Sequence, residues 1–292
     1  MDLMTTAEVA AYLRLKERTV YEMASRGQIP CTRATGKLLF PRRLVDRWLE
    51  AHTDVPGARV AAPPPIYAGS SDPLLEWALR ACDSGLAVLA RGSADGLERL
   101  ARGEAALAGI HLLDAQTRTY NVEAIRRALP FPDVVSIRLC AREQGLLVAA
   151  GNPLGLSGIE DVARVNARVA LRPEGAGSRL LLDVLCARAG IAPDALETVA
   201  RPAQTQGDLA ALIASGEADA GIGVRAAAVG AGLGFVPLGI VEPFDVVMRR
   251  RDYFEPPVQA LMRFLLDPAF AETAERLGGY DIAEAGRVVL NA

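Results

Sequence analysis

The spacing of apolar residues divides the chain into two regions with different expected structures. Up to about residue 50, apolar positions recur every three or four residues in three short stretches, which predicts helices over 5–13, 17–26 and 43–50. Residues 29–41 read as two extended segments around Gly36-Lys37, which predicts a hairpin. From Ile66 onward, short apolar runs alternate with helical stretches, the pattern of an α/β fold.

The first 53 residues have the pattern of a winged helix-turn-helix. Thr5 and Glu8 form a capping box for the first helix, and Gly27 suits the end of the second. The second helix turns Val20, Met23 and Ala24 inward and leaves Arg18, Thr19, Glu22 and Arg26 outside, as a recognition helix does. The third helix is expected to bury Leu44, Val45, Trp48 and Leu49.

Charge supports a nucleic-acid partner for this region. Residues 1–53 hold nine Lys and Arg against six Asp and Glu, whereas the remainder holds 23 against 29. We expect Arg18, Thr19, Tyr21 and Arg26 on or near bases and phosphates. The residues expected on the DNA backbone are Arg33, Lys37 and Arg42.

The order of these residues resembles a known family. Met4-Thr5-Thr6-Ala7-Glu8-Val9-Ala10, Arg18-Thr19-Val20-Tyr21, Gly27-Gln28-Ile29-Pro30, Gly36-Lys37 and Leu44-Val45-Asp46-Arg47-Trp48-Leu49 are similar to the excisionase/MerR-type DNA-binding domain. The resemblance implies DNA contact. A helical cap or a protein-binding domain is the alternative for this segment.

Residues 54–65 contain four prolines and no periodicity, which predicts a stiff linker. Residues 66–292 predict an α/β domain with a mostly parallel sheet and two similar lobes joined by two crossing segments. The expected lobes are 66–145 with 246–292, and 146–245. Ligands of such sheets bind beyond the carboxyl ends of the strands, which is where the Gly and Ser turns of this sequence lie.

The turn Arg172-Pro173-Glu174-Gly175-Ala176-Gly177-Ser178-Arg179 has the chemistry of an anion site. Val169-Ala170-Leu171 reads as a short buried strand before it, and a helix is expected to start at or near Ser178. The free N–H groups of a helix start attract an anion, and Arg179 adds a full positive charge. Two similar turns occur upstream, at Gly69-Ser70-Ser71-Asp72 and Gly92-Ser93.

These turns resemble the type 2 periplasmic-binding-protein superfamily, in its branch fused to helix-turn-helix domains. The residues that carry the resemblance are Gly69 to Pro73, Gly92 to Leu97, Ala108 to Leu112, Tyr120-Asn121, Gly175 to Arg179 and Ala218 to Gly223. The branch is also similar to a domain of molybdopterin-biosynthesis proteins. The resemblance implies a hinged two-lobed fold and an oxyanion ligand such as molybdate or tungstate. Ser71 departs from the usual Gly-Ser-His-Asp.

Several residues are therefore candidates for ligand binding, each with a structural alternative. Serines at helix starts either donate to the ligand or cap their helices. His111 either contacts the ligand or makes a structural hydrogen bond, and Asp72 either accepts from a protonated ligand group or caps its own helix. Arg179 and Arg225 either bind the ligand or pair with acids such as Asp183 or Glu242. The full candidate set is Ser70, Ser71, Asp72, Gly92, Ser93, His111, Tyr120, Asn121, Gly177, Ser178, Arg179, Gly221 and Arg225.

Several other classes of function lack their signals. Four separated Cys and two His disfavour a zinc site or a disulfide framework, and we expect no metal and no cofactor. No nucleophile elbow or phosphate loop occurs, so we expect a non-enzyme. No signal peptide or apolar run of membrane-spanning length is visible, which predicts a cytoplasmic protein without membrane contact.

Together, the patterns predict a one-component transcriptional regulator. The N-terminal domain binds DNA, and the two-lobed domain closes on a small anion. A homodimer is expected, because one domain of this size makes few contacts and paired half-sites need two. The alternative is a non-transcriptional ligand sensor or molybdenum-cofactor accessory protein whose N-terminal domain binds another protein.

Overall fold

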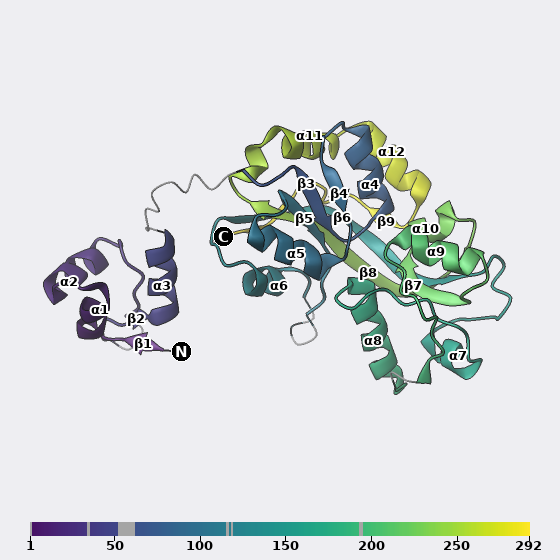
Figure 1. Cartoon of the computed structure of the whole chain (residues 1–292), viewed down its shortest axis with the longest axis horizontal. Helices are drawn as coiled ribbons and strands as arrows, with labels where there is room; N and C mark the ends of the chain where they lie inside the picture. Colours follow the sequence, from purple (N-terminus) through teal and green to yellow (C-terminus); the bar gives the residue numbers. More distant parts are fainter. Residues whose placement is uncertain (1, 34–35, 52–61, 115–116, 118, 193–194) are drawn as a thin grey trace. The chain divides into compact units, whose positions relative to one another are not determined.

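The computed structural model describes residues 2–33, 36–51, 62–114, 117, 119–192 and 195–292. The chain forms two compact units, Met1–Ala61 and Ala62–Ala292, which we call the head and the body (Figure 1). Residues 54–61 of the predicted linker lie outside the described residues. Among the described residues, no helix has both the length and the apolar character needed to cross a membrane.

The head is a three-helix domain with a small antiparallel sheet. Its elements are β1 (Leu3–Met4), α1 (Thr6–Leu13), α2 (Glu17–Ser25), β2 (Phe40–Pro41) and α3 (Arg42–Ala51). Thr5 caps α1 through the predicted capping box with Glu8, so that expectation is confirmed. Thr32 and Leu39 pair antiparallel within the predicted hairpin, whose residues 34–35 are not described.

The core of the head confirms most of the predicted inward positions. Of the predicted positions, Val20 and Val45 have no solvent exposure and Ala24 is 4% exposed, and Val9 and Phe40 are buried with them. The prediction that Leu44 is buried is wrong, because this residue is 45% exposed. It lies next to the fully buried Val45 on a short helix that buries only one face.

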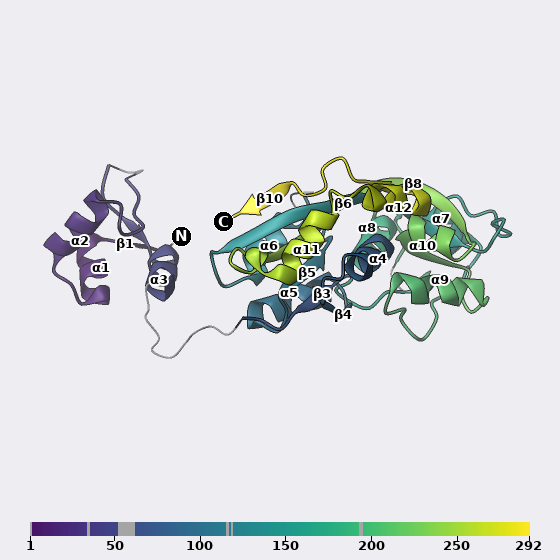
Figure 2. The ribbon, with the colours of Figure 1, turned by 90° about the horizontal axis from the view of Figure 1, so that it is seen from above.

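The body is built around two long antiparallel strands. The strands β6 (Val134–Val148) and β8 (Gly234–Arg249) pair from Val134 opposite Arg249 to Val148 opposite Gly234. Figures 1 and 2 both show them side by side through the length of the body. They are the two crossing segments between the lobes. Their register shifts between Arg138 and Cys140 and again between Gln144 and Gly145.

The remaining elements group on either side of this pair. The first lobe comprises β3 (Ile66–Gly69), α4 (Pro73–Ala81), β4 (Ala87–Leu89), α5 (Ser93–Arg102), β5 (Leu107–Ile110), α6 (Val122–Ala128), η2 (Asp252–Phe254), α11 (Pro256–Phe264), α12 (Pro268–Leu277), β9 (Tyr280–Asp281) and β10 (Val288–Asn291). The second lobe comprises α7 (Ile159–Arg164), α8 (Gly177–Ala189), α9 (Gln206–Ala214), β7 (Ala220–Val224) and α10 (Arg225–Gly230). Each lobe has its own apolar core.

The expectation of a mostly parallel sheet is wrong. Only β3 pairs in parallel with β4 and with β5, among the ladders of the described residues. The ladders β5–β8, β6–β8, β6–β7, β6–β9 and β6–β10 are antiparallel. The strand β6 runs from the first lobe to the second and β8 runs back, so the two strands are antiparallel. The predicted strand 169–171 is also reduced, since Val169 forms only isolated bridges to Thr198 and Ala220.

Candidate functional site

Turns before three helices bring polar residues of the first lobe together. Ser70 follows β3 and Ser93 begins α5, and their hydroxyl oxygens lie 2.8 Å apart. The Ser93 hydroxyl also accepts a hydrogen bond of 3.1 Å from the N–H of His111, which follows β5. All three residues are buried. The structure therefore gathers these three predicted residues at one place.

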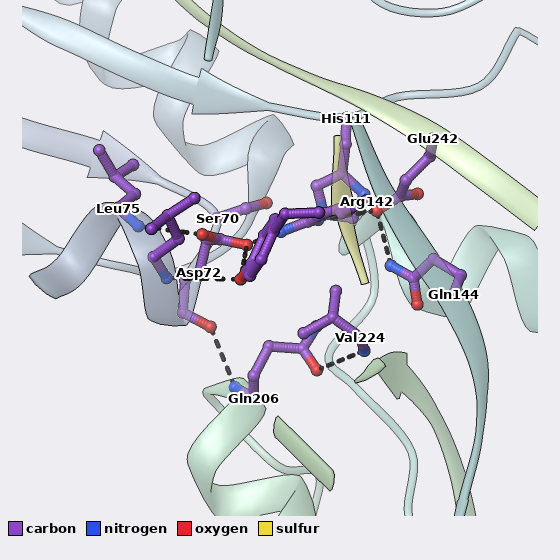
Figure 3. Close-up of polar contacts among 12 residues, drawn as sticks. Ser70, Asp72, Leu75, His111, Arg142, Gln144, Gln206, Val224 and Glu242 are labelled. Carbon is purple, nitrogen blue, oxygen red and sulfur yellow. Dashed lines mark hydrogen bonds and ion pairs between the residues drawn. The ribbon is translucent and has the colours of Figure 1, made fainter. Parts of the chain in front are cut away.

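Ser71 connects this place to the second lobe. Its hydroxyl accepts a hydrogen bond of 3.0 Å from the N–H of Gln206, the first residue of α9. The side-chain oxygen of Gln206 in turn accepts from the N–H of Val224 at the end of β7, 3.4 Å away (Figure 3). A direct contact between the lobes thus uses one of the hydroxyls predicted for the ligand.

The start of α8 packs directly against His111. A Cβ atom on Gly177 would lie 2.4 Å from the imidazole, so only glycine fits there. A Cβ on Gly92 would lie 3.6 Å from the Cα of Ala176, the residue before Gly177. The turn of the second lobe therefore meets the turns of the first, as the predicted closing of two lobes requires.

None of the four candidate serines, Ser70, Ser71, Ser93 and Ser178, caps its own helix. Asp72 caps α4 by accepting from the N–H of Leu75, which confirms the capping alternative for Asp72. The N-cap residues of α5 and α8 are Gly92 and Ala176, neither with a side-chain cap. Ser178 is buried at the second position of α8. The capping alternative is therefore wrong for the serines.

A chain of buried charges lies next to these turns, and the sequence analysis named its acids, Asp72 and Glu242, but not Arg142 or Gln144. Arg142 of β6 donates from Nη1 to Asp72, 2.7 Å away, and from Nε to Oε1 of Glu242, 2.8 Å away (Figure 3). Gln144 donates to the same Oε1 over 2.6 Å. The guanidinium also lies over the ring of Phe244, 4.3 Å from its centre. The available signal was a positive charge within the apolar run of β6.

These neighbours set the protonation of the buried groups. Burial alone would raise the pKa of Glu242, but the charges of His111 and Arg142, with the Gln144 hydrogen bond, lower it to about 2. Nδ1 of His111 lies 3.0 Å from Oε1 of Glu242, outside hydrogen-bond geometry. Burial lowers the pKa of His111, against the attraction of Glu242. The site therefore holds Glu242 as a carboxylate.

Arg172 is a buried cation of a different kind. It is 5% exposed, and it belongs to the turn that leads into α8. Within the described part of the chain its guanidinium makes one hydrogen bond, from Nη2 to the carbonyl of Gln204 at 2.9 Å, and Nε has no partner. Burial and then the charge of Arg142 lower its pKa to about 10. Its charge also lowers the pKa of His111, so it acts on the same site.

Arg172 was part of the motif that predicted an anion site, but it was not a predicted ligand residue. A buried guanidinium without a carboxylate partner is energetically unfavourable on its own. Asp208 and Glu76 attract Arg172 without forming an ion pair, and an anion at this position would supply the acceptors that it lacks. Arg172 is therefore a further candidate for ligand binding, which the sequence analysis did not include.

Two predicted ligand arginines have partners within the protein. Arg179 lies 3.3 Å from Asp183, one helical turn away, which is one of the pairings expected for it. Arg225 pairs with Glu143, 2.5 Å away, and stacks on Phe235, 4.4 Å from the ring centre. Its acid partner is thus neither Asp183 nor Glu242.

The other predicted ligand residues have structural contacts as well. Asn121 accepts from the N–H of Leu112 and donates to Asp245, 2.6 Å away. Tyr120 is half-buried, and burial together with the charge of Glu242 raises its pKa to about 12. A Cβ on Gly221 would lie 2.7 Å from Leu209, so this glycine serves packing between β7 and α9.

The predicted DNA-binding residues of the head lie on accessible surfaces. Arg18, Thr19, Tyr21 and Arg26 are exposed on or next to α2. Arg33 and Lys37 are exposed on the hairpin, and Arg42 at the start of α3 lies over the ring of Tyr12, 5.0 Å from its centre. A groove of about 680 Å³ separates α2 from the hairpin, lined by Glu17, Arg18, Tyr21, Glu22, Ser25, Arg33 and Leu38.

Within the described ranges, no group of three His, Cys, Asp or Glu side chains is arranged to hold a metal ion. The site offers hydroxyl and guanidinium donors instead, beside the carboxylates of Asp72 and Glu242, which are paired with Arg142. This donor set suits an anion.

Two family models match the chain. A PBP superfamily domain matches residues 77–266, and a helix-turn-helix domain matches residues 3–53. The uncharacterized protein YvgK of Bacillus subtilis is 26% identical over 98% of this chain and 97% of its own length.

Among solved structures, the body has the fold of substrate-binding proteins. A putative phosphate ABC transporter substrate-binding protein of Clostridium perfringens, solved with bound phosphate, has a TM-score of 0.55 at 13% identity, over 74% of this chain and 98% of the other. A tungstate ABC transporter structure from Geobacter sulfurreducens has a TM-score of 0.51 at 12% identity, over 72% and 97%. These similarities confirm the expected two-lobed fold.

Proposed function

The chain belongs to the PBP superfamily and carries a helix-turn-helix domain, and on this basis we propose that it is a one-component transcriptional regulator controlled by a small anion. Residues 1–53 bind DNA through α2 and the hairpin. Residues 66–292 bind the anion where the turns of the two lobes meet. A DNA-binding regulator of this kind acts in the cytoplasm.

The observation that carries the anion assignment is the state of Arg172. The two acids of the site, Asp72 and Glu242, are already engaged by Arg142. Arg172 is therefore left with an unpartnered Nε and a single backbone acceptor among the described residues. Tetrahedral oxyanions such as molybdate, tungstate and phosphate offer several acceptors to such a fork. The phosphate and tungstate named for the two similar structures agree with this class.

The closing of the lobes around the anion provides the proposed switch. The contacts between Ser71 and Gln206, and between Gly177 and His111, belong to the closed form, so an anion that binds both lobes would favour this form over an open one. We propose a homodimer, because a change in the body then alters the spacing of two DNA-binding heads. Sedimentation of the purified protein at micromolar concentration tests this, and a monomer at all concentrations would exclude it.

A thermal-shift screen tests the anion assignment. The purified full chain is titrated with molybdate, tungstate, phosphate, sulfate and small carboxylates. A ligand at a hundred times its Kd stabilises by about 2.7 kcal/mol, which raises the melting temperature of a domain of this size by about 5–10 °C. We expect this shift with an oxyanion in the wild type and in Arg188→Met, which changes an exposed arginine of α8, and its loss in Arg172→Met.

DNA binding is tested separately. Fluorescence anisotropy with fragments of the gene's own upstream region is measured between 50 and 200 mM salt. Neutralising several phosphates predicts a steep loss of affinity over this range, on the order of 10³-fold for six contacts. Anion binding without DNA binding would favour the non-transcriptional sensor or molybdenum-cofactor accessory protein. DNA binding without any oxyanion shift would reject the oxyanion assignment alone.

A further inference from the structure

The DNA-facing surface of the head contains a carboxylate that its stability does not require. Along α2, the residues that line the groove next to the hairpin form one stripe, Glu17, Arg18, Tyr21, Glu22 and Ser25. Phosphates repel carboxylates, so an acid in a DNA-binding surface weakens non-specific binding. Two acids in one stripe therefore need a physical reason.

Glu17 has a structural reason to be acidic, whereas Glu22 has little. Glu17 lies in the first turn of α2, where a negative charge stabilises the helix start. Glu22 lies farther along α2, and its contact is an ion pair with Arg18 at 3.2 Å. The side chains of Arg18 and Glu22 are 90% and 51% exposed. An ion pair with this much solvent exposure contributes little to stability.

We propose that Glu22 determines the DNA sequence specificity of the head by reading a cytosine in the major groove. This inference rests on the proposed DNA-binding function. A carboxylate only accepts hydrogen bonds, and the N4 amino group of cytosine donates one in the major groove. The exposed face of a recognition helix is the face that enters the major groove, and Glu22 is exposed on α2 beside the hairpin.

The pairing with Arg18 supports this role. Four residues span about 6 Å along a helix, or about two base-pair steps, so Arg18 and Glu22 face bases close to each other in the sequence. The ion pair orients both side chains on the exposed face before DNA is bound. On DNA, Arg18 binds the O6 and N7 acceptors of a guanine, while Glu22 accepts from a nearby cytosine.

In vitro selection from a random duplex library tests the proposal with the full chain. Wild type, Glu22→Gln, Glu22→Ala and the control Glu17→Gln are compared, and all three changes introduce good helix formers. We expect one cytosine in the wild-type motif to become degenerate with Glu22→Ala and to shift to adenine with Glu22→Gln, because an amide pairs with adenine N6 and N7. On a fixed wild-type site, replacing that cytosine should weaken wild-type binding about tenfold but leave Glu22→Ala unaffected.

The outcomes separate this inference from the function on which it rests. A wild-type motif that stays the same in both Glu22 variants overturns the role of Glu22 while DNA binding stands. If Glu17→Gln also loses the cytosine preference, the preference depends on the charge of the surface and not on base readout by Glu22, and the proposal is overturned. No enrichment of any sequence by the wild type would instead reject specific DNA binding by the head.

Discussion

Two buried arginines show how differently the two sides of the body handle charge. Arg142, on the crossing strand next to the first lobe, lies between the carboxylates of Asp72 and Glu242. Arg172, in the α8 turn of the second lobe, bonds to one backbone carbonyl and has no carboxylate partner within the described residues. One charge is satisfied by the protein itself. The other is available for an anion, so the second lobe is where ligand affinity should be most easily lost.

The largest expected effect comes from removing each arginine in turn. Arg142→Met leaves two buried carboxylates without their cation and should lower the free energy of unfolding by about 3–5 kcal/mol. Arg172→Met removes a cation that has no carboxylate partner and makes one hydrogen bond, to the Gln204 carbonyl, so the same quantity should change by only about 1 kcal/mol. Urea unfolding without added anions measures both. Equal losses in the two variants would contradict the distinction between a paired and an unpaired arginine.

The pH dependence of stability probes the first-lobe side of the comparison. The pKa of Glu242 is lowered from 4.5 to about 2 in the folded protein, so the unfolded chain binds its proton first as pH falls. This carboxylate therefore contributes about 3 kcal/mol above pH 4.5, and the contribution is lost as pH falls toward 2. The pKa of His111 is also lowered, so further stability is lost below its usual value of 6.5.

Urea unfolding at pH values from 3 to 8 measures this dependence. Glu242→Gln should be less stable than the wild type at pH 7, and its stability should fall less steeply below pH 4.5. A wild-type stability that rises as pH falls from 7 to 4 would have the wrong sign for both groups.

The contact between the two sides can be disturbed through Gly177. Gly177→Ala places a methyl group 2.4 Å from the His111 ring and should cost about 1–3 kcal/mol or separate the lobes. Gly230→Ala is the matched control, because a Cβ there meets nothing within 4 Å. Thermal melts of the two variants, with and without oxyanion, measure the effect. A Gly177→Ala protein that melts like the control would show that the α8 turn does not press on His111.

Much of the architecture could be predicted because local signals specify it. The Thr5–Glu8 capping box and Gly27 define the helices of the head, and the Gly and Ser turns locate three helix starts of the body. Strand direction could not be predicted in this way. The apolar runs of β6 and β8 look alike whether they lie parallel or antiparallel, and only their pairing across the lobes distinguishes the two.

The polar site was predictable only in part, for a related reason. Serine and glycine indicate a turn through their own backbone preferences, so Ser70 and Ser93 could be predicted as site residues. The roles of Arg142 and Glu242 depend on residues a hundred positions apart meeting in one ladder. Ser71 was found as a hydroxyl near the site, but its partner Gln206 lies 135 residues away and carries no local signal.

The smallest predicted effect concerns that hydrogen bond between the lobes. Ser71→Ala removes the acceptor of the Gln206 N–H and should lower the free energy of unfolding by about 1 kcal/mol. The helix α9 keeps its capping box between Thr205 and Asp208, so its own stability should change little. If Ser71 serves mainly to hold the lobes together, hydrogen exchange at Gln206 should quicken in the absence of anion and recover when oxyanion is bound. If Ser71 instead binds the ligand, the variant should lose oxyanion affinity while exchange in the absence of anion stays unchanged. The two results distinguish a contact made by the protein alone from one completed by the ligand.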